Sequence, residues 1–130
     1  MVLGLHLAFT VKRRVLVIED DPDGRRLIVE ALTERGIDVI AAVDGLHALR
    51  TALAVSPSVV VLDLALPEMD GATFVQQWRE RYPEARGVPV VVVSGKSDAS
   101  EIGTRIGARR VFKKPFVVDE LVNEVSRVLN

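Results

Sequence analysis

The sequence contains no cysteine and no excess of either charge, and each absence excludes a class of protein. Without cysteine, the 130-residue chain can form neither a disulfide nor a thiolate metal site, which is compatible with a reducing compartment. Its 17 basic and 18 acidic residues give a formal net charge of -1, which does not support a nucleic-acid-binding surface. We therefore expect a cytoplasmic protein that makes no direct contact with nucleic acid.

A long hydrophobic run is absent too. Residues 2–11 are mostly apolar, but this segment is about half as long as a membrane-spanning helix, and its basic residues follow it instead of preceding it. We expect neither a signal peptide nor a membrane span. Apolar residues alternate along the segment as in a strand. Residues 1–13 are therefore interpreted as an N-terminal extension: an added strand, a linker from a preceding domain, or residues carried over from cloning.

Residues 14–130 have the length of one domain, in which short apolar runs alternate with helical patterns. The longer runs are rich in valine and have no polar face, which predicts strands buried on both sides of a sheet. Five strands are expected, at residues 15–18, 37–42, 59–62, 90–93 and 111–112. Strands separated by helices form βαβ units with right-handed crossovers. The sequence therefore predicts an α/β fold: a doubly wound, five-stranded parallel sheet with helices on both faces.

Each of the first four predicted helices begins at an aspartate, a residue that caps helix N-termini well. These aspartates are Asp21, Asp44, Asp70 and Asp98. Glu101 is expected to complete a capping box with the last of them. Leu27 is expected on the inner face of the first helix, with Leu46 and Leu53 on that of the second. The fourth helix is short and contains Gly103, so the sequence predicts a weak element there.

Charged or hydroxyl side chains follow four of the predicted strands. Glu19 and Asp20 follow the first strand, Asp63 the third, Ser94 the fourth and Lys114 the fifth. Because the carboxyl ends of parallel strands lie at one edge of a sheet, we expect these side chains to converge. The alternative for any single residue is that it merely ends its strand, but that does not account for all four strand ends being polar.

Three neighbouring carboxylates cannot all stay ionised without a counter-charge, so this cluster calls for a cation. With oxygen ligands and no thiolate or imidazole, Mg²⁺ fits best, because it binds a few carboxylates and readily takes water and phosphate oxygens. An aspartate can also act as a nucleophile toward phosphorus. The residues therefore favour phosphoryl transfer to Asp63, with the metal on one phosphoryl oxygen, Lys114 on another and the Ser94 hydroxyl on a third.

Four short motifs, in this order, resemble one known family. They are Glu19-Asp20-Asp21, the stretch Leu-Asp-Leu-Ala-Leu-Pro-Glu-Met-Asp-Gly at residues 62–71, Ser94-Gly95, and Lys114-Pro115-Phe116. Together they resemble the receiver domain of bacterial two-component response regulators, over roughly residues 14–129. The resemblance implies a receiver domain at residues 14–130 with the flavodoxin-like strand order 2-1-3-4-5.

The resemblance also implies roles for the acidic residues. Asp63 would accept a phosphoryl group from a sensor histidine kinase or a histidine phosphotransfer protein. Glu19 and Asp20 would form the acidic pair that holds Mg²⁺, together with Asp63 and the backbone carbonyl of Ala65. Such a domain catalyses only its own phosphorylation and dephosphorylation, and it signals through protein–protein contacts.

The remaining motifs would respond to the phosphoryl group. Ser94 would be the switch hydroxyl, followed by Gly95, and Lys114 would pair with the phosphate. The bond between Lys114 and Pro115 would be a cis peptide, which X-Pro bonds in turns can adopt. A homodimer is compatible with this reading.

Two features depart from the family pattern. Val111 stands where receivers usually have tyrosine or phenylalanine, three residues before the lysine, and the segment from Ser94 to Lys114 is shorter than usual. They leave open a second interpretation, a pseudo-receiver that docks partners independently of phosphorylation. A third, a haloacid-dehalogenase-like phosphatase, is disfavoured because it needs a second aspartate two residues after Asp63, where this sequence has Ala65.

Overall fold

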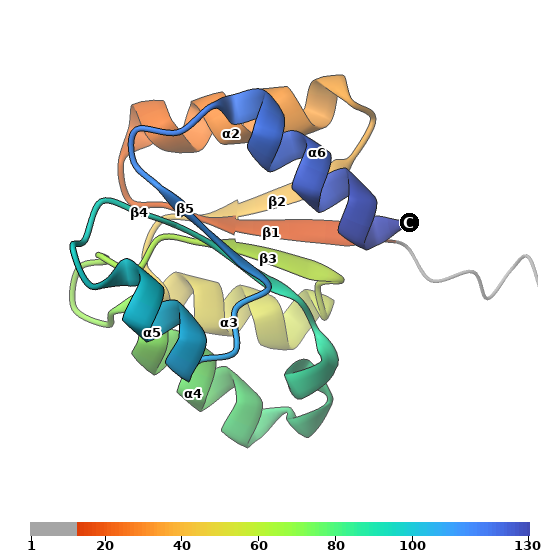
Figure 1. Cartoon of the computed structure of the whole chain (residues 1–130). Coiled ribbons are helices and arrows are strands. Elements are labelled where there is room, and N and C mark those ends of the chain that lie inside the picture. Colours follow the sequence, from red (N-terminus) through yellow and green to blue (C-terminus); the bar gives the residue numbers. More distant parts are fainter. Residues whose placement is uncertain (1–12) are drawn as a thin grey trace, which may run out of the picture.

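The computed structural model describes residues 13–130 (Figure 1). Its strands are β1 Arg14–Ile18, β2 Asp38–Ala42, β3 Val59–Leu62, β4 Val90–Ser94 and β5 Arg110–Lys113. Its helices are α2 Pro22–Glu34, α3 Gly45–Val55, α4 Gly71–Arg81, the 3-10 helix η1 Pro83–Gly87, α5 Ala99–Arg105 and α6 Val118–Leu129. None of these helices is long and apolar enough to cross a membrane. The interpretation of residues 1–13 as an extension concerns residues that, except for Arg13, lie outside the described part of the chain.

The sheet has the predicted topology. All five strands are parallel and lie in the order β2-β1-β3-β4-β5. Figure 1 shows α2 and α6 over one face of the sheet, and α3, α4 and α5 over the other. Each face carries its own apolar core. The fold is therefore the doubly wound α/β sheet of the flavodoxin type that the sequence predicts.

The central strands are buried on both faces, which explains their valine-rich sequences. All four residues of β3 and all five of β4 are buried. Val60 and Leu62 belong to the core on the side of α3 and α4, whereas Val59 and Val61 belong to the core on the side of α2 and α6. Burying each valine contributes roughly 1.5–3 kcal/mol. A charged residue is therefore tolerated only where the strand leaves the core, and Asp63 stands at that point.

The helix starts agree with the predicted caps in three of four cases. The aspartates before α2, α3 and α4 each accept a hydrogen bond from the backbone N–H three residues on, at 2.7–2.8 Å. The capping box predicted for Asp98 and Glu101 is wrong, since Asp98 makes no side-chain bond to the start of α5. The helix α5 has seven residues and is therefore short, as the sequence predicts, and without such a cap it is expected to be weak.

The predicted inner faces of α2 and α3 are partly wrong. Leu27, Leu46 and Leu53 are 39–52% exposed. The fully buried positions of α3 are instead taken by small residues, Ala48 and Ala52. Small side chains let a helix lie close to a tightly packed sheet, so Leu46 and Leu53 lie at the edge of the interface, whereas Leu49 is buried in it, as its helical spacing predicts.

Gly71, at the start of α4, sets the distance between this helix and the end of β3. A Cβ atom at this position would lie 2.8 Å from the Asp63 carbonyl oxygen and 2.9 Å from Leu64 Cα. The Gly71 N–H donates to the Leu64 carbonyl at 3.0 Å. Backbone contact therefore holds the loop that carries Asp63 against α4, and a larger residue at position 71 would push it away.

Candidate functional site

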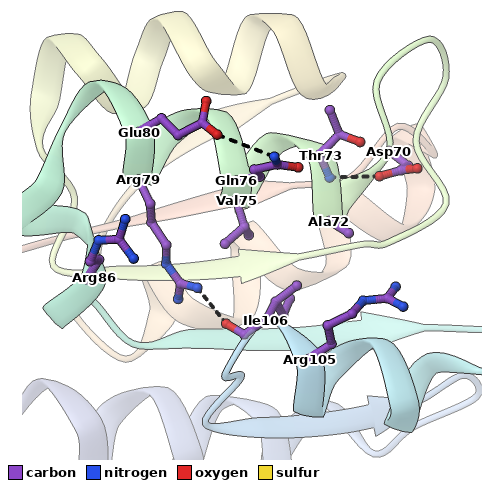
Figure 2. Close-up of a pocket in the computed structure, with 10 residues that line it drawn as sticks. All are labelled: Asp70, Ala72, Thr73, Val75, Gln76, Arg79, Glu80, Arg86, Arg105 and Ile106. Carbon is purple, nitrogen blue, oxygen red and sulfur yellow. Dashed lines mark hydrogen bonds between the residues drawn. The ribbon is translucent and has the colours of Figure 1, made fainter.

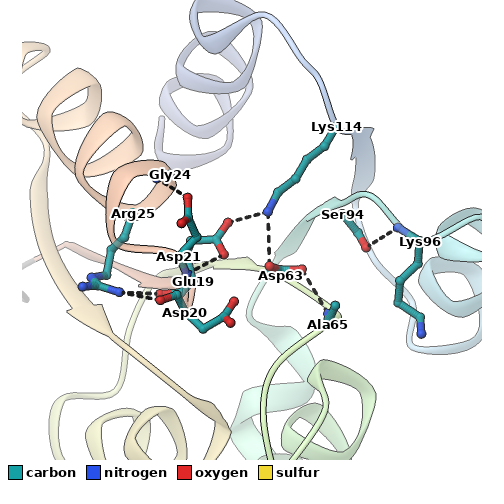
Figure 3. A network of polar contacts seen from close by, with 10 residues as sticks. All are labelled: Glu19, Asp20, Asp21, Gly24, Arg25, Asp63, Ala65, Ser94, Lys96 and Lys114. Carbon is teal, nitrogen blue, oxygen red and sulfur yellow. Dashed lines mark hydrogen bonds and ion pairs between the residues drawn. The ribbon is translucent and has the colours of Figure 1, made fainter.

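The carboxyl ends of β1, β3, β4 and β5 meet at one edge of the sheet, and the predicted polar residues converge there (Figure 3). The last residues of β1 and β3 pair with each other in the sheet, as do Ser94 of β4 and Lys113 of β5. Figure 3 shows Glu19, Asp63 and Lys114 pointing toward one another, although they are far apart in the sequence. The sheet register thus assembles the acid cluster, which consists of Glu19, Asp20 and Asp63.

Asp63 begins the loop after β3 and is only 5% exposed. Its Oδ1 accepts a hydrogen bond from the Ala65 N–H at 3.0 Å, and its Oδ2 lies 3.2 Å from Lys114 Nζ. Its own N–H donates to the Ile18 carbonyl at 3.0 Å, which extends the β1–β3 pairing by one residue. These contacts hold the carboxylate in one orientation, as a nucleophile requires.

Lys114 reaches the acid cluster from the loop after β5. Its Nζ lies 2.7 Å from Glu19 Oε1 and 3.2 Å from Asp63 Oδ2, so two buried carboxylates share one ammonium group. The peptide bond between Lys114 and Pro115 is cis, in agreement with the prediction. Because the lysine side chain is 34% exposed, a ligand can approach its ammonium group from solvent.

The acid cluster has the ligands of a hard metal ion. Glu19, Asp20 and Asp63 each offer one carboxylate oxygen, and these oxygens lie within 4.8 Å of one another. Three carboxylates face the single ammonium of Lys114, so negative charge is in excess. Oxygen ligands with this charge fit Mg²⁺. Ala65 contacts the cluster through its N–H, and the role of its carbonyl as a ligand stays a prediction.

Burial and the neighbouring negative charge both affect the pKa of Glu19. Burial, together with the neighbouring Asp63 carboxyl, raises the pKa of Glu19 to about 7, although the ammonium of Lys114 opposes this change. For Lys114, burial alone would lower the pKa, but the hydrogen bonds and charges of Glu19 and Asp63 outweigh it and raise the pKa. The lysine therefore stays charged, but its single positive charge does not neutralise both the Glu19 and the Asp63 carboxylates.

Ser94 is fully buried at the end of β4, and its Oγ accepts a hydrogen bond from the Lys96 N–H at 3.1 Å. The hydrogen bonds within residues 13–130 include none between Ser94 and Asp63. Gly95 is not required by steric contact, because a Cβ atom there would meet only Lys114 Cβ, at 3.9 Å. The switch roles of Ser94 and Gly95 stay predictions.

With this geometry established, comparison with known proteins identifies the family. The sequence matches the family model of the response regulator receiver domain over residues 15–126. This chain belongs to the receiver domain family. The transcriptional regulatory protein PrrA of Mycobacterium bovis is 38% identical over 118 residues, which are 89% of this chain and 49% of PrrA. This receiver thus spans about half the length of the curated relatives it matches.

Solved receiver structures share the fold. The receiver domain of a Francisella response regulator has a TM-score of 0.80 at 28% identity, covering 90% of this chain and 96% of that one. The Thermotoga maritima response regulator TrrA, solved in complex with Mg(2+)-BeF, has a TM-score of 0.76 at 26% identity, covering 89% and 98%. The receiver fold therefore accounts for almost all of the chain that the structure describes.

Val111, one of the two departures from the family pattern that the resemblance implies, packs against α5. A Cβ atom on Gly103 of α5 would lie only 2.5 Å from Val111 Cγ2. The sequence predicts that Gly103 weakens α5. The structure gives it a packing role as well, because the missing side chain lets α5 lie directly on Val111.

Arg25 of α2 is a residue of the receiver site that sequence analysis missed. Its Nη1 donates to the backbone carbonyls of Glu19 at 2.9 Å and Asp20 at 3.3 Å (Figure 3). It thereby holds the backbone that carries two of the three acids. An arginine on the polar face of a helix has no distinguishing sequence signal, because only the packing of α2 beside β1 brings it to these carbonyls.

Proposed function

We propose that Asp63 of this receiver domain accepts a phosphoryl group in a Mg²⁺-dependent reaction and thereby switches protein–protein interactions. The donor would be a sensor histidine kinase or a histidine phosphotransfer protein in the cytoplasm. The observation that carries the proposal is the contact of Lys114 with two buried carboxylates, one of which is Asp63. Burying more carboxylates than cations costs free energy, which a purely structural site has no reason to accept.

In this reaction, an Asp63 oxygen forms a bond to phosphorus while the bond from phosphorus to the donor's histidine nitrogen breaks, and the electron pair of that bond stays on the nitrogen. Lys114, already 3.2 Å from Asp63 Oδ2, would pair with a phosphoryl oxygen on that aspartate. The Ser94 Oγ accepts from the Lys96 N–H, so the hydroxyl hydrogen would remain to donate to another phosphoryl oxygen.

Glu19, Asp20, Asp63 and the Ala65 carbonyl would hold the metal ion. When bound, Mg²⁺ supplies positive charge that neutralises the phosphoryl oxygens. The raised pKa of Glu19, caused first by burial and then by the neighbouring Asp63 carboxyl, supports this assignment, since a bound cation would oppose both effects.

The surface beside the acid cluster supports a protein as the phosphoryl donor. A hollow of about 250 Å³ beside the acid cluster is lined by Glu19 and Lys114 together with the apolar residues Leu27, Pro115 and Phe116. Leu27 is 52% exposed there. Apolar side chains exposed next to a reactive group are typical of a docking surface. A histidine-bearing partner that covers Leu27 would bring its phosphohistidine to Asp63.

The residues of this chain are proposed to act through proteins and not through DNA. PrrA is named as a transcriptional regulatory protein, and this chain matches about half of it. The net charge of -1 does not favour binding of a nucleic-acid phosphate backbone by the present chain. We also propose that it is not an enzyme for other substrates and catalyses only its own phosphorylation and dephosphorylation.

Phosphorylation of the full chain with acetyl phosphate tests the proposal. Mass spectrometry should find one phosphoryl group on the wild type in the presence of Mg²⁺, little without Mg²⁺, and none on Asp63→Asn. Equal labelling of the wild type and Asp63→Asn would contradict the assignment of Asp63. If neither acetyl phosphate nor a histidine phosphodonor protein labelled the wild type, the result would favour the pseudo-receiver interpretation.

A further inference from the structure

The three carboxylates of the acid cluster are not held equally. Glu19 and Asp63 are buried, and both accept hydrogen bonds from Lys114 Nζ. The Asp20 side chain is exposed, and within residues 13–130 it makes no hydrogen bond or ion pair. One of its oxygens nevertheless lies within 4.8 Å of an oxygen of each of the other two acids. The direction of the Asp20 side chain is therefore restrained only through its backbone.

Arg25 is the side chain that holds this stretch of backbone. Its Nη1 donates to the Glu19 carbonyl at 2.9 Å and to the Asp20 carbonyl at 3.3 Å (Figure 3). Both carbonyls lie in the junction between the end of β1 and the start of α2. No backbone N–H of residues 13–130 donates to either of them. The arginine therefore supplies hydrogen bonds that neither the sheet nor the helix provides there.

The charge of Arg25 by itself does not favour a metal site. Within residues 13–130, no carboxylate oxygen lies within 4.0 Å of its guanidinium nitrogens, so its hydrogen bonds go to neutral carbonyls. The next residue, Arg26, is exposed and lies 3.8 Å from Asp23 on the same helix. A positive charge near a cation site repels the cation. If charge were its only effect, Arg25 would weaken metal binding.

We propose that Arg25 is a positioning residue of the metal site, which fixes the junction between β1 and α2 so that Asp20 can bind one Mg²⁺ together with Glu19 and Asp63. This inference rests on the Mg²⁺ site of the proposed function. Groups that orient metal ligands without touching the metal typically change affinity by about ten- to a hundredfold. Positioning strengthens binding and charge repulsion weakens it, so the sign of the effect of removing Arg25 separates the two.

Titration of the full chain with Mg²⁺ at pH 8, followed by ¹H–¹⁵N NMR, tests this proposal. Arg25→Met removes the donors and the charge but keeps an unbranched side chain that suits a helix. We expect it to weaken Mg²⁺ binding about tenfold, although it removes a positive charge. Arg25→Lys keeps a charged donor and should restore part of the affinity. In the metal-free protein, amide hydrogen exchange at Asp20 and Asp21 should be faster in Arg25→Met than in the wild type.

Two further variants are matched controls. Arg26→Met removes the same charge from the next residue of α2. Arg79→Met removes a comparable hydrogen bond elsewhere in the fold, since Arg79 Nη1 of α4 donates to the Ile106 carbonyl at the end of α5, at 2.7 Å (Figure 2). Neither side chain contacts the acid cluster in residues 13–130, so both variants should bind Mg²⁺ as the wild type does.

The proposal is overturned if Arg25→Met binds Mg²⁺ as tightly as the wild type or more tightly, because charge alone would then describe the arginine. It is also overturned if either control weakens binding as much as Arg25→Met, or if circular dichroism shows that both Arg25 variants are unfolded. Failure of the proposed function is distinguishable: a wild type that bound no Mg²⁺ would refute the metal site and this inference together, whereas equal binding by the wild type and Arg25→Met would refute only the role of Arg25.

Discussion

Glu19 and Glu124 are both buried, and burial alone would raise the pKa of each, yet their pKa values shift in opposite directions. Glu19 is 2% exposed, and burial followed by its Asp63 neighbour raises its pKa to about 7. Glu124, in α6, is 5% exposed, and its pKa is lowered, chiefly by hydrogen bonds from Arg127. Arg127 Nη2 donates to the two Glu124 oxygens at 2.8 and 2.7 Å, and Arg110 Nη1 lies 3.6 Å from Oε1. Two arginines therefore serve one carboxylate in α6, whereas one lysine serves two at the acid cluster.

The two sites differ in the number of cations that oppose burial: burial is the largest cause of the raised pKa of Glu19, whereas the hydrogen bonds from Arg127 outweigh burial at Glu124. A buried carboxylate with its own cations is complete, and Glu124 with Arg110 and Arg127 links α6 to β5. A buried carboxylate that shares its cation stays short of positive charge, and Glu19 with Asp63 and Lys114 is in that state. In this protein, a perturbed carboxyl pKa therefore points to a functional site where the buried carboxylates outnumber their cations, as at Glu19 and Asp63, and not where each carboxylate has its own cations, as at Glu124.

Binding of Mg²⁺ should separate the two sites most strongly. Asp20→Asn removes one of three carboxylates from the acid cluster, so we expect Mg²⁺ affinity, measured by calorimetry at pH 8, to fall at least about tenfold. Glu124→Gln also removes a carboxylate charge from the domain but should leave the affinity unchanged. If both variants lost affinity equally, overall charge and not the cluster would control metal binding.

A phosphoryl mimic bound at the acid cluster should change the conformation of residues 95–107 but not that of α6, which carries Glu124. With Mg²⁺ and beryllofluoride, amide hydrogen exchange is expected to slow several-fold across residues 95–107, because α5 is short, has no side-chain cap and is easily ordered. The helix that carries Glu124 should not change. Val111 should keep one rotamer, since valine has a single side-chain torsion and a strong preference in it.

Lys114→Ala tests the cause of that response. The lysine pairs with charge that arises on phosphorylation, so the variant should keep its circular dichroism spectrum and lose most of the exchange response. Unchanged exchange at residues 95–107 in the wild type, with a change confined to α6, would contradict the proposed route. An unfolded Lys114→Ala protein would show that the lysine has a structural role.

The smallest expected effect is on stability at the Glu124 site. Glu124 has a lowered pKa in the folded protein, so its contribution is complete above the unfolded value of about 4.3 and is lost as pH falls through the folded pKa. Glu124→Gln should lower the Tm by about 3 °C or less at pH 7, because its arginine partners are exposed and screened by solvent. Thermal melts should show the difference shrinking toward pH 3. A constant difference across this range would mean that packing, and not charge, is responsible.

The sequence by itself determined the sheet and the place of the site. Valine-rich runs specify buried strands because they have no polar face, and the polar residues that follow them must lie at the carboxyl edge of a parallel sheet. Asp63 and Lys114 were identified on that basis together with the family motifs. The strand order came from the resemblance and is confirmed by the sheet pairing.

Only the tertiary structure decided how side chains from distant segments meet. It placed Leu27 at the surface and removed the predicted capping box at Asp98, because helix packing overrides local preference. It showed that the absence of a side chain at Gly103 leaves room for Val111, a contact between α5 and β5 that no local sequence pattern predicts. It also brought Arg25 of α2 to the backbone that carries two residues of the acid cluster. Local patterns reflect the free energy of a single helix or strand, whereas these features depend on the distance between two of them, which is set only when the whole core packs.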